Sequence, residues 1–207
     1  MPKTFFPSEK YRRILSWKMV MPLSGPTQCG VSMIELLVVM AIIAIMLGWG
    51  GAHMVTHLSE YRLKAAVRDL ISTMQKARMT AVRNNAETAV FFDPAIGTYS
   101  LCTGSGDGDW GTMSDNICPQ ERSFASYNSG IGYGHGNATR PVPDGATFPV
   151  DDVSYSANRV AFKSMGNANK IGYVYIENDK GQSYAIGTIM IGTILSVKWD
   201  GNSWKYN

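Results

Sequence analysis

The sequence predicts an α+β protein in which a long N-terminal helix packs on an antiparallel β-rich head. Two observations support this expectation. An apolar run and then an amphipathic stretch extend from Val31 to Asn84 without a proline, and short strand-like segments separated by turn residues follow. With 207 residues, 45% of them hydrophobic and 17% charged, the chain can bury one core, which excludes a disordered protein.

Residues 1–30 read as a basic leader with four prolines and no sustained apolar period. They hold five basic residues and one acidic residue, a net charge of +4, so the rest of the chain carries −1. The overall charge of +3 therefore belongs to the leader. It gives no support for a head that binds polyanions.

Residues 31–53 are expected to form a transmembrane and assembly helix. The 17 residues from Leu36 to Ala52 contain no charge, and the residues before Glu35 extend the segment to the length that a bilayer requires. The basic flank predicts that the N-terminal side stays in the cytoplasm. The alternative is a buried core helix. It would need more surrounding protein than this chain supplies, because the segment is apolar on every face.

Residues 54–85 are expected to continue as an amphipathic helix. Apolar residues recur there at helical spacing and form one stripe, while most of the basic residues lie off it. The stripe consists of Leu63, Val67, Leu70, Met74, Ala77 and Ala81. Without an intervening proline, the span and this stretch are compatible with one continuous helix of about 80 Å.

Residues 86–207 are expected to form the β-rich head. Strands are expected at Ala89–Asp93, Thr98–Cys102, Arg159–Lys163, Ile171–Glu177, Tyr184–Met190 and Ile194–Trp199. Turn residues at 178–181 and 200–201 favour antiparallel hairpins. Residues 103–145 contain nine glycines and little periodicity, and are expected to form an irregular loop insertion.

The junction between the leader and the apolar run places Gly30 shortly before a solitary acid, Glu35. An ionised carboxylate within a membrane is costly, so it is by default a hypothesis of function. A positive charge is its natural partner, and cleavage after Gly30 would create one as the amine of Val31. A neighbouring subunit, staggered along an assembly, could present that amine to Glu35.

These residues, GVSMIELLVVMAIIAIM, resemble the prepilin signal of type IV pilins and type II secretion pseudopilins. The resemblance implies that a prepilin peptidase cuts between Gly30 and Val31 and methylates the new amine of Val31. It also implies that Glu35 acts in filament assembly. Val31 stands where phenylalanine is commoner in the family. The fold implied is pilin-like.

Two later segments resemble the group formed by minor pseudopilin H and FimT. The first carries an AR-x-x-A-x-x-x-N-like pattern at Ala77, Arg78, Ala81 and Asn85, and the second carries F-x-x-x-G at Phe162 and Gly166. FimT-like members that bind DNA have G-R-x-R near the last strand. The matching positions here, 192–195, read Gly-Thr-Ile-Leu without an arginine. Nucleic acid is therefore not expected as a partner.

The resemblance implies a structural minor pseudopilin of a type II secretion pseudopilus that acts in filament assembly and protein secretion. The alternative is a type IV pilus minor pilin that acts in pilus biogenesis, DNA uptake or adhesion. Either protein would cross the inner membrane once and place its head in the periplasm. Its partners would be other pilins, bound through the N-terminal helix, and the prepilin peptidase. No catalytic or phosphate-binding motif occurs, so neither enzyme activity nor a cofactor is expected.

The cysteines favour one disulfide. Cys102 and Cys118 are the pair left after removal of the leader, which contains Cys29, and disulfides persist outside the inner membrane. The alternative is two unpaired thiols.

Three other groups of residues have both a structural and a functional interpretation. Asp107, Asp109 and Asp115 resemble calcium ligands, but glycine-rich acidic loops are usually just solvated. His53, His57 and Glu60 share a helix face that could hold zinc, yet such residues more often mark a membrane interface. No metal site is therefore expected. The tail interleaves aromatics with Lys198 and Lys205, which suits either stacked bases or a terminal hairpin.

Overall fold

The computed structural model describes residues 30–104, 110, 117–142 and 147–206, with the side chains of residues 49–56 and 120 excepted. The chain divides into two compact units, Met1–Leu47 and Gly48–Asn207. The expected leader lies outside the described residues except for Gly30. Each unit is described by itself below.

The long helix expected from the apolar and amphipathic patterns is α1, Met33–Asn84. In the first unit, every large hydrophobic side chain of residues 31–47 is at least 45% exposed. In the part of the chain that the structure describes, no helix has both the length and the apolarity needed to cross a membrane.

The C-terminal part of α1, in the second unit, presents the expected stripe to the core. Leu63, Leu70, Met74, Ala77 and Ala81 are fully buried, and Val67 is nearly so. Ala66 and the hydroxyl residues Ser59 and Thr73 widen the buried face. Since burial of apolar area is the main force holding such a helix to a domain, this stripe fixes α1 in the head.

Asn85 ends the helix. It takes a left-handed conformation (φ 50°), which asparagine tolerates better than most residues. Its amide donates to the carbonyl of Val82 (3.4 Å), and the amide of Ala86 donates to the carbonyl of Ala81 (3.2 Å). This pair of hydrogen bonds is a Schellman motif. The asparagine of the AR-x-x-A-x-x-x-N-like pattern is therefore the left-handed residue that ends the helix.

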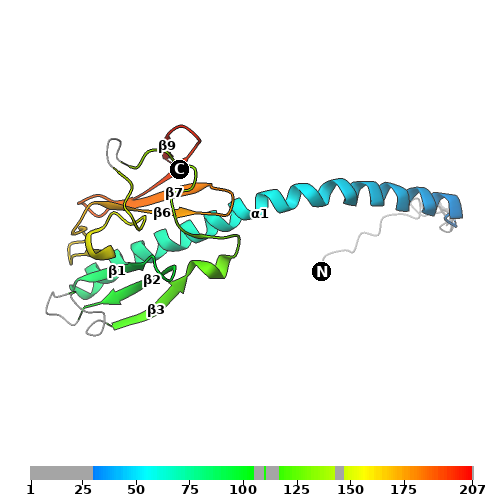
Figure 1. Ribbon diagram of the computed structural model, residues 1–207. Helices are drawn as coiled ribbons and strands as arrows, with labels where there is room; N and C mark the ends of the chain where they lie inside the picture. The colour runs from blue at the N-terminus through cyan, green and yellow to red at the C-terminus, as the bar shows by residue number, and fades with distance from the viewer. Residues whose placement is uncertain (1–29, 105–109, 111–116, 143–146, 207) are drawn as a thin grey trace, which may run out of the picture. The chain divides into compact units, whose positions relative to one another are not determined.

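The first sheet is antiparallel and has the order β3-β2-β1-β5, and Figure 1 shows β3, β2 and β1 side by side. Its strands are β1 Thr88–Asp93, β2 Thr98–Thr103, β3 Ile117–Ser123 and β5 Arg159–Phe162. A short 3₁₀ helix, η1 Phe124–Tyr127, follows β3, and another, η2 Ser156–Asn158, precedes β5. β1 lies inside the sheet between β2 and β5, which agrees with the burial of four of its six residues.

The second sheet is antiparallel and has the order β4-β6-β7-β8-β9. Its strands are β4 Gly132–Tyr133, β6 Gly172–Glu177, β7 Ser183–Thr188, β8 Ile194–Trp199 and β9 Trp204–Tyr206. The turns expected at 178–181 and 200–201 connect β6 to β7 and β8 to β9. The tail is therefore the terminal hairpin that was one of its two interpretations.

The α1 stripe and both sheets share one hydrophobic core. Side chains from the first sheet, such as Phe92 and Tyr99, join side chains from the second, such as Ile176 and Ile186, around Leu70. The head is thus the α+β fold that the sequence predicts.

The expectation of an irregular insertion at 103–145 needs correction. This segment contributes β3, which pairs with β2, and β4, which pairs with β6. Neither strand has a strong sequence pattern: β3 reads ICPQERS, and β4 has only two residues. Backbone pairing with an existing strand edge builds both, and hydrophobic periodicity does not report such pairing.

Candidate functional site

The residues of the expected processing and assembly site lie at the start of α1. Gly30 and Val31 precede the helix and are exposed, and Glu35 lies in its first turn. A carboxylate in the first turn interacts favourably with the partial positive charge of the helix N-terminus. Around it, the apolar side chains of residues 31–47 are exposed without a covering partner in this unit. Such a surface requires lipid or other helices to cover it.

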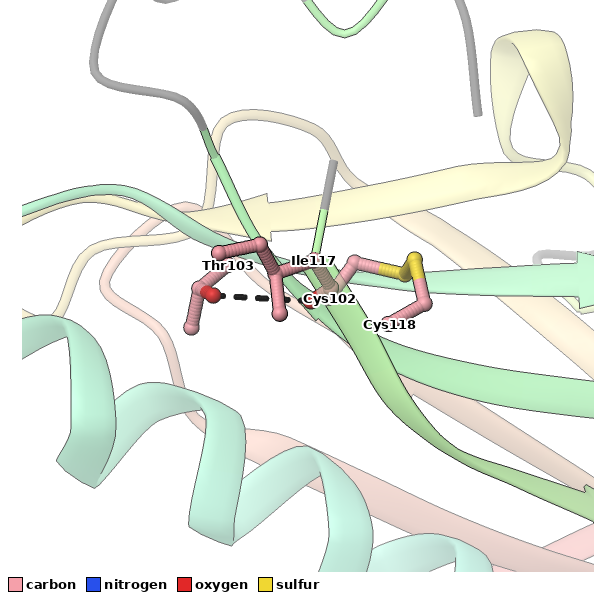
Figure 2. The surroundings of a disulfide bond; sticks show 4 residues. All are labelled: Cys102, Thr103, Ile117 and Cys118. Carbon is pink, nitrogen blue, oxygen red and sulfur yellow. Dashed lines mark hydrogen bonds between the residues drawn. A yellow bond between two sulfur atoms is a disulfide. The ribbon is translucent and has the colours of Figure 1, made fainter. Parts of the chain in front are cut away.

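The disulfide expected from the cysteine count joins Cys102 and Cys118 (Figure 2). It ties the end of β2 to the start of β3, beside the Thr103 hydroxyl, which donates to the carbonyl of Ile117 (3.4 Å). The register between the two strands shifts between Leu101 and Thr103, so Cys102 lies at an irregularity of the ladder. The cross-link therefore holds the end of β2 against the start of β3.

Trp110, between β2 and β3 in the sequence, packs near the disulfide, and sequence reasoning missed it. Its ring is buried against Cys102, Ala89 and Ala161. Its indole nitrogen donates to Glu87 (2.9 Å), and its carbonyl accepts from Arg159 (2.6 Å). A lone tryptophan in a glycine-rich segment was the available signal, because a side chain that large is seldom left exposed.

The three segments singled out by resemblance meet at Arg78. The guanidinium donates through Nε to the carbonyl of Gly166 (2.9 Å) and through Nη2 to the carbonyl of Ile191 (3.5 Å). A Cβ on Gly192 would lie 1.9 Å from the Gly166 carbonyl oxygen, so the two loops touch through their backbones. The arginine of the helix and the two glycines thus form one structural junction at the end of α1.

A cavity of about 600 Å³ lies beside the C-terminal hairpin, between the β6–β7 turn and the tail. Lys198 lines it and forms an ion pair with Glu60 (2.7 Å), and Lys205 lines it and pairs with Asp200 (2.6 Å). Lys198 and Lys64 hold the pKa of Glu60 down to about 2 through their hydrogen bonds to its carboxylate. The two tail lysines that the sequence offers for phosphate contacts are therefore each ion-paired with a carboxylate.

Two of the three tail aromatics, Trp199 and Trp204, cover each other, while Tyr206 is exposed. The rings of Trp199 and Trp204 meet edge to face, 5.3 Å apart, and the Trp204 indole donates to the carbonyl of Arg140 (2.6 Å). The contact between the two tryptophan rings is the one that the structural interpretation of the tail expects.

Among the described residues, no three His, Cys, Asp or Glu side chains converge on a metal position, and each candidate metal site includes residues outside this set. The three aspartates, Asp107, Asp109 and Asp115, lie outside the described residues. So does the side chain of His53. His57 is exposed, and Glu60 is engaged with Lys64 and Lys198.

The comparisons with known proteins decide the family. The model of the type II transport protein GspH family matches residues 66–190, and that of the prokaryotic N-terminal methylation motif matches residues 26–50. The chain belongs to the GspH family. Its members are membrane-anchored structural pilins and pseudopilins, so this GspH-family chain is a minor pseudopilin or a type IV minor pilin.

Two solved structures are similar to the chain. The type IV minor pilin FimU of Pseudomonas aeruginosa has 12% identity and a TM-score of 0.48 over 70% of this chain and 94% of that one. The minor pseudopilin EpsH from the type 2 secretion system of Vibrio cholerae has 9% identity and a TM-score of 0.38 over the same shares. No curated protein matches this GspH-family chain in sequence.

Proposed function

We propose that the chain is a structural minor pseudopilin of a type II secretion system, and that it acts in filament assembly and protein secretion. The observation that carries the proposal is the match to the type II transport protein GspH family over most of the head. The ion pair of Lys198 with Glu60 and the hydrogen bonds of Arg78 join separate segments of the head to one another. Their arrangement suits a structural subunit better than a catalyst.

The N-terminal segment would be processed and inserted into the inner membrane, with the head in the periplasm. The methylation-motif match includes Gly30, Val31 and Glu35. The unpartnered apolar side chains of residues 31–47 support a lipid or helical environment, since water disfavours so large an apolar surface. Other pilins and the prepilin peptidase would be its partners.

Glu35 would pair with the methylated amine of Val31 from a neighbouring subunit. Within an apolar environment a carboxylate is stable only when it is paired and hydrogen-bonded. The segment offers no other charge from residue 31 to Leu47, so the amine created by cleavage is the natural partner. The pairing would set the stagger between subunits.

Intact-mass analysis of the protein extracted from membranes tests the processing step. We expect a species that begins at Val31 and carries one additional methyl group. Gly30→Glu should abolish it, because a bulky charged side chain replaces the residue before the cut. A mature protein that begins at any other residue would refute the proposed site.

The Glu35→Ala variant tests the assembly step. It should be processed and inserted normally but should crosslink poorly to partner pilins, because the neighbour's amine loses its counter-charge. Met33→Ala is the matched control, since it removes an exposed side chain of the same turn without changing charge. Wild-type crosslinking of Glu35→Ala would contradict the pairing.

Deletion of the gene separates the proposed system from its alternative. Under the proposal, the deletion strain fails to release secreted proteins into the medium and keeps pilus-dependent motility and DNA uptake. The reverse phenotype would identify the chain as a type IV pilus minor pilin. Complementation with the full chain should restore whichever phenotype is lost.

A further inference from the structure

Five large apolar side chains are exposed together on the head, at the C-terminal end of α1. They come from the last turns of the helix and from the loops after β5 and β7, and each is between 53% and 86% exposed. We name them the methionine patch: Met79, Val82, Met165, Met190 and Ile191. Isolated exposed apolar residues are normal, but a group from three segments marks a surface for interaction.

The Arg78 junction holds these three segments side by side. The Arg78 guanidinium donates to the carbonyls of Gly166 and Ile191. The Val82 side chain lies against Gly166, the residue after Met165. The carbonyl of Met190 accepts from the amide of Ala168 (3.1 Å). The methionine patch is therefore fixed by hydrogen bonds between backbone and side chain, while its methionine side chains remain adaptable to a partner's shape.

The three segments that form the methionine patch carry charge of one sign. The segments 76–86, 163–168 and 189–193 contain Lys76, Arg78, Arg83 and Lys163, and no aspartate or glutamate. Arg83 and Lys163 are exposed, and neither side chain forms an ion pair or hydrogen bond within the described residues. The patch is thus an apolar centre with a basic rim.

We propose that the methionine patch is the docking surface for the head of a different pilin-type subunit that presents an apolar centre with an acidic rim. A second copy of this chain does not fit, because its own patch would oppose basic residues to basic residues. The inference rests on the proposed function, since it names the partner surface of a filament subunit.

Anionic lipid also suits apolar and basic groups, but the position of the patch favours a protein. Along the helix of the second unit, Met79 lies about 45 Å from Gly48, given the rise of an α-helix. Under the proposed function the membrane anchor is residues 31–53, which leaves Met79 about 39 Å along the helix from the end of the anchor. The patch would then be at the far end of that helix from its anchored end, where another head is the available partner.

Site-specific photocrosslinking in the native host tests this proposal with the full chain. A photoreactive residue at Met165 is expected to crosslink to another pilin-type protein that carries acidic residues around the contact. The same probe at Ile96, exposed in the β1–β2 turn outside the patch, is the control and should not give that adduct. Mass spectrometry identifies the partner and the contact peptide.

Charge reversal tests the basic rim. The Arg83→Glu/Lys163→Glu double variant should lower the Met165 adduct by about tenfold, as expected for two rim charges turned against an acidic partner. Arg68→Glu, exposed on the same helix outside the patch, should leave it unchanged. Reversal of an acidic rim residue on the partner should restore the adduct of the double variant.

The possible results separate the two proposals. No adduct at Met165, an adduct with a second copy or with lipid, or an adduct insensitive to the double variant would overturn the docking surface. If that happens while secretion still depends on the chain and Glu35→Ala still blocks assembly, only this inference fails. If secretion is independent of the chain, the proposed function fails, whatever the crosslinks show.

Discussion

Replacing Gly192 with alanine is expected to destabilise the head much more than the same replacement at Gly97. Both glycines have left-handed backbones, with φ of 80° and 69°. They differ in their surroundings: a Cβ at Gly97 would meet no atom within 4 Å, whereas a Cβ at Gly192 would lie 1.9 Å from the carbonyl oxygen of Gly166. The comparison therefore isolates the contact between the two loops.

The expected size follows from these contacts. In both variants the left-handed conformation destabilises the folded state by about 1–2 kcal/mol once the residue is alanine. In both variants the lower conformational entropy of the unfolded chain offsets about 0.4–1 kcal/mol of this cost. At Gly192 the Gly166 carbonyl must also move by roughly 1 Å, which strains packing at a cost of about 1–3 kcal/mol. The movement weakens its hydrogen bond from Arg78, worth about 1 kcal/mol. Gly192→Ala should therefore lose about 2–4 kcal/mol more than Gly97→Ala.

Thermal unfolding of residues 54–207, followed by circular dichroism with the disulfide intact, measures the difference. For a domain of this size, about 2–4 kcal/mol corresponds to a Tm difference of about 5–15 °C. Equal losses at the two glycines would show that backbone conformation alone sets the cost. The close approach of Gly192 to the Gly166 carbonyl would then contribute nothing to the stability of the head.

Three further changes test the core, the cross-link and the ion pair. Leu70→Asp, which buries a charge in the stripe, should cost several kcal/mol and unfold the head in urea, whereas Arg68→Asp, exposed on the same helix, should be mild. The Cys102→Ser/Cys118→Ser variant should be about 3 kcal/mol less stable to denaturant, and dithiothreitol should then have no further effect. Because its lysine partners lower the pKa of Glu60 from 4.5 to about 2, the stabilisation by this carboxylate is present above pH 4.5. This stabilisation should be lost as the pH falls toward 2. Glu60→Gln should remove this part of the pH dependence of the unfolding free energy. A variant with the same pH dependence as the wild type would argue against the ion pairs.

Much of the fold and of the candidate site is written locally in the sequence. Helical periodicity identified every stripe residue from Leu63 to Ala81, because burial against a core selects apolar residues at the repeat of the helix. The glycine, glutamate and apolar run around Gly30 identified the family's N-terminal motif. The cysteine count identified the pair joined in the disulfide. Turn residues likewise placed the hairpins that connect β6 to β7 and β8 to β9.

Other features depend on residues far apart in the chain, and only the tertiary structure decided them. β3 and β4 form because neighbouring strands offer free backbone donors and acceptors, which leaves no mark on periodicity. The partners of Lys198 and Lys205 are carboxylates that no spacing rule identifies, so the sequence alone does not show that these two lysines are ion-paired. In the sequence, Arg78 stands out only through the AR-x-x-A-x-x-x-N-like pattern, which does not reveal what the guanidinium contacts. Its contacts with carbonyls 88 and 113 residues away make it the junction of the head, because close approach of two loops arises only when the whole chain is packed.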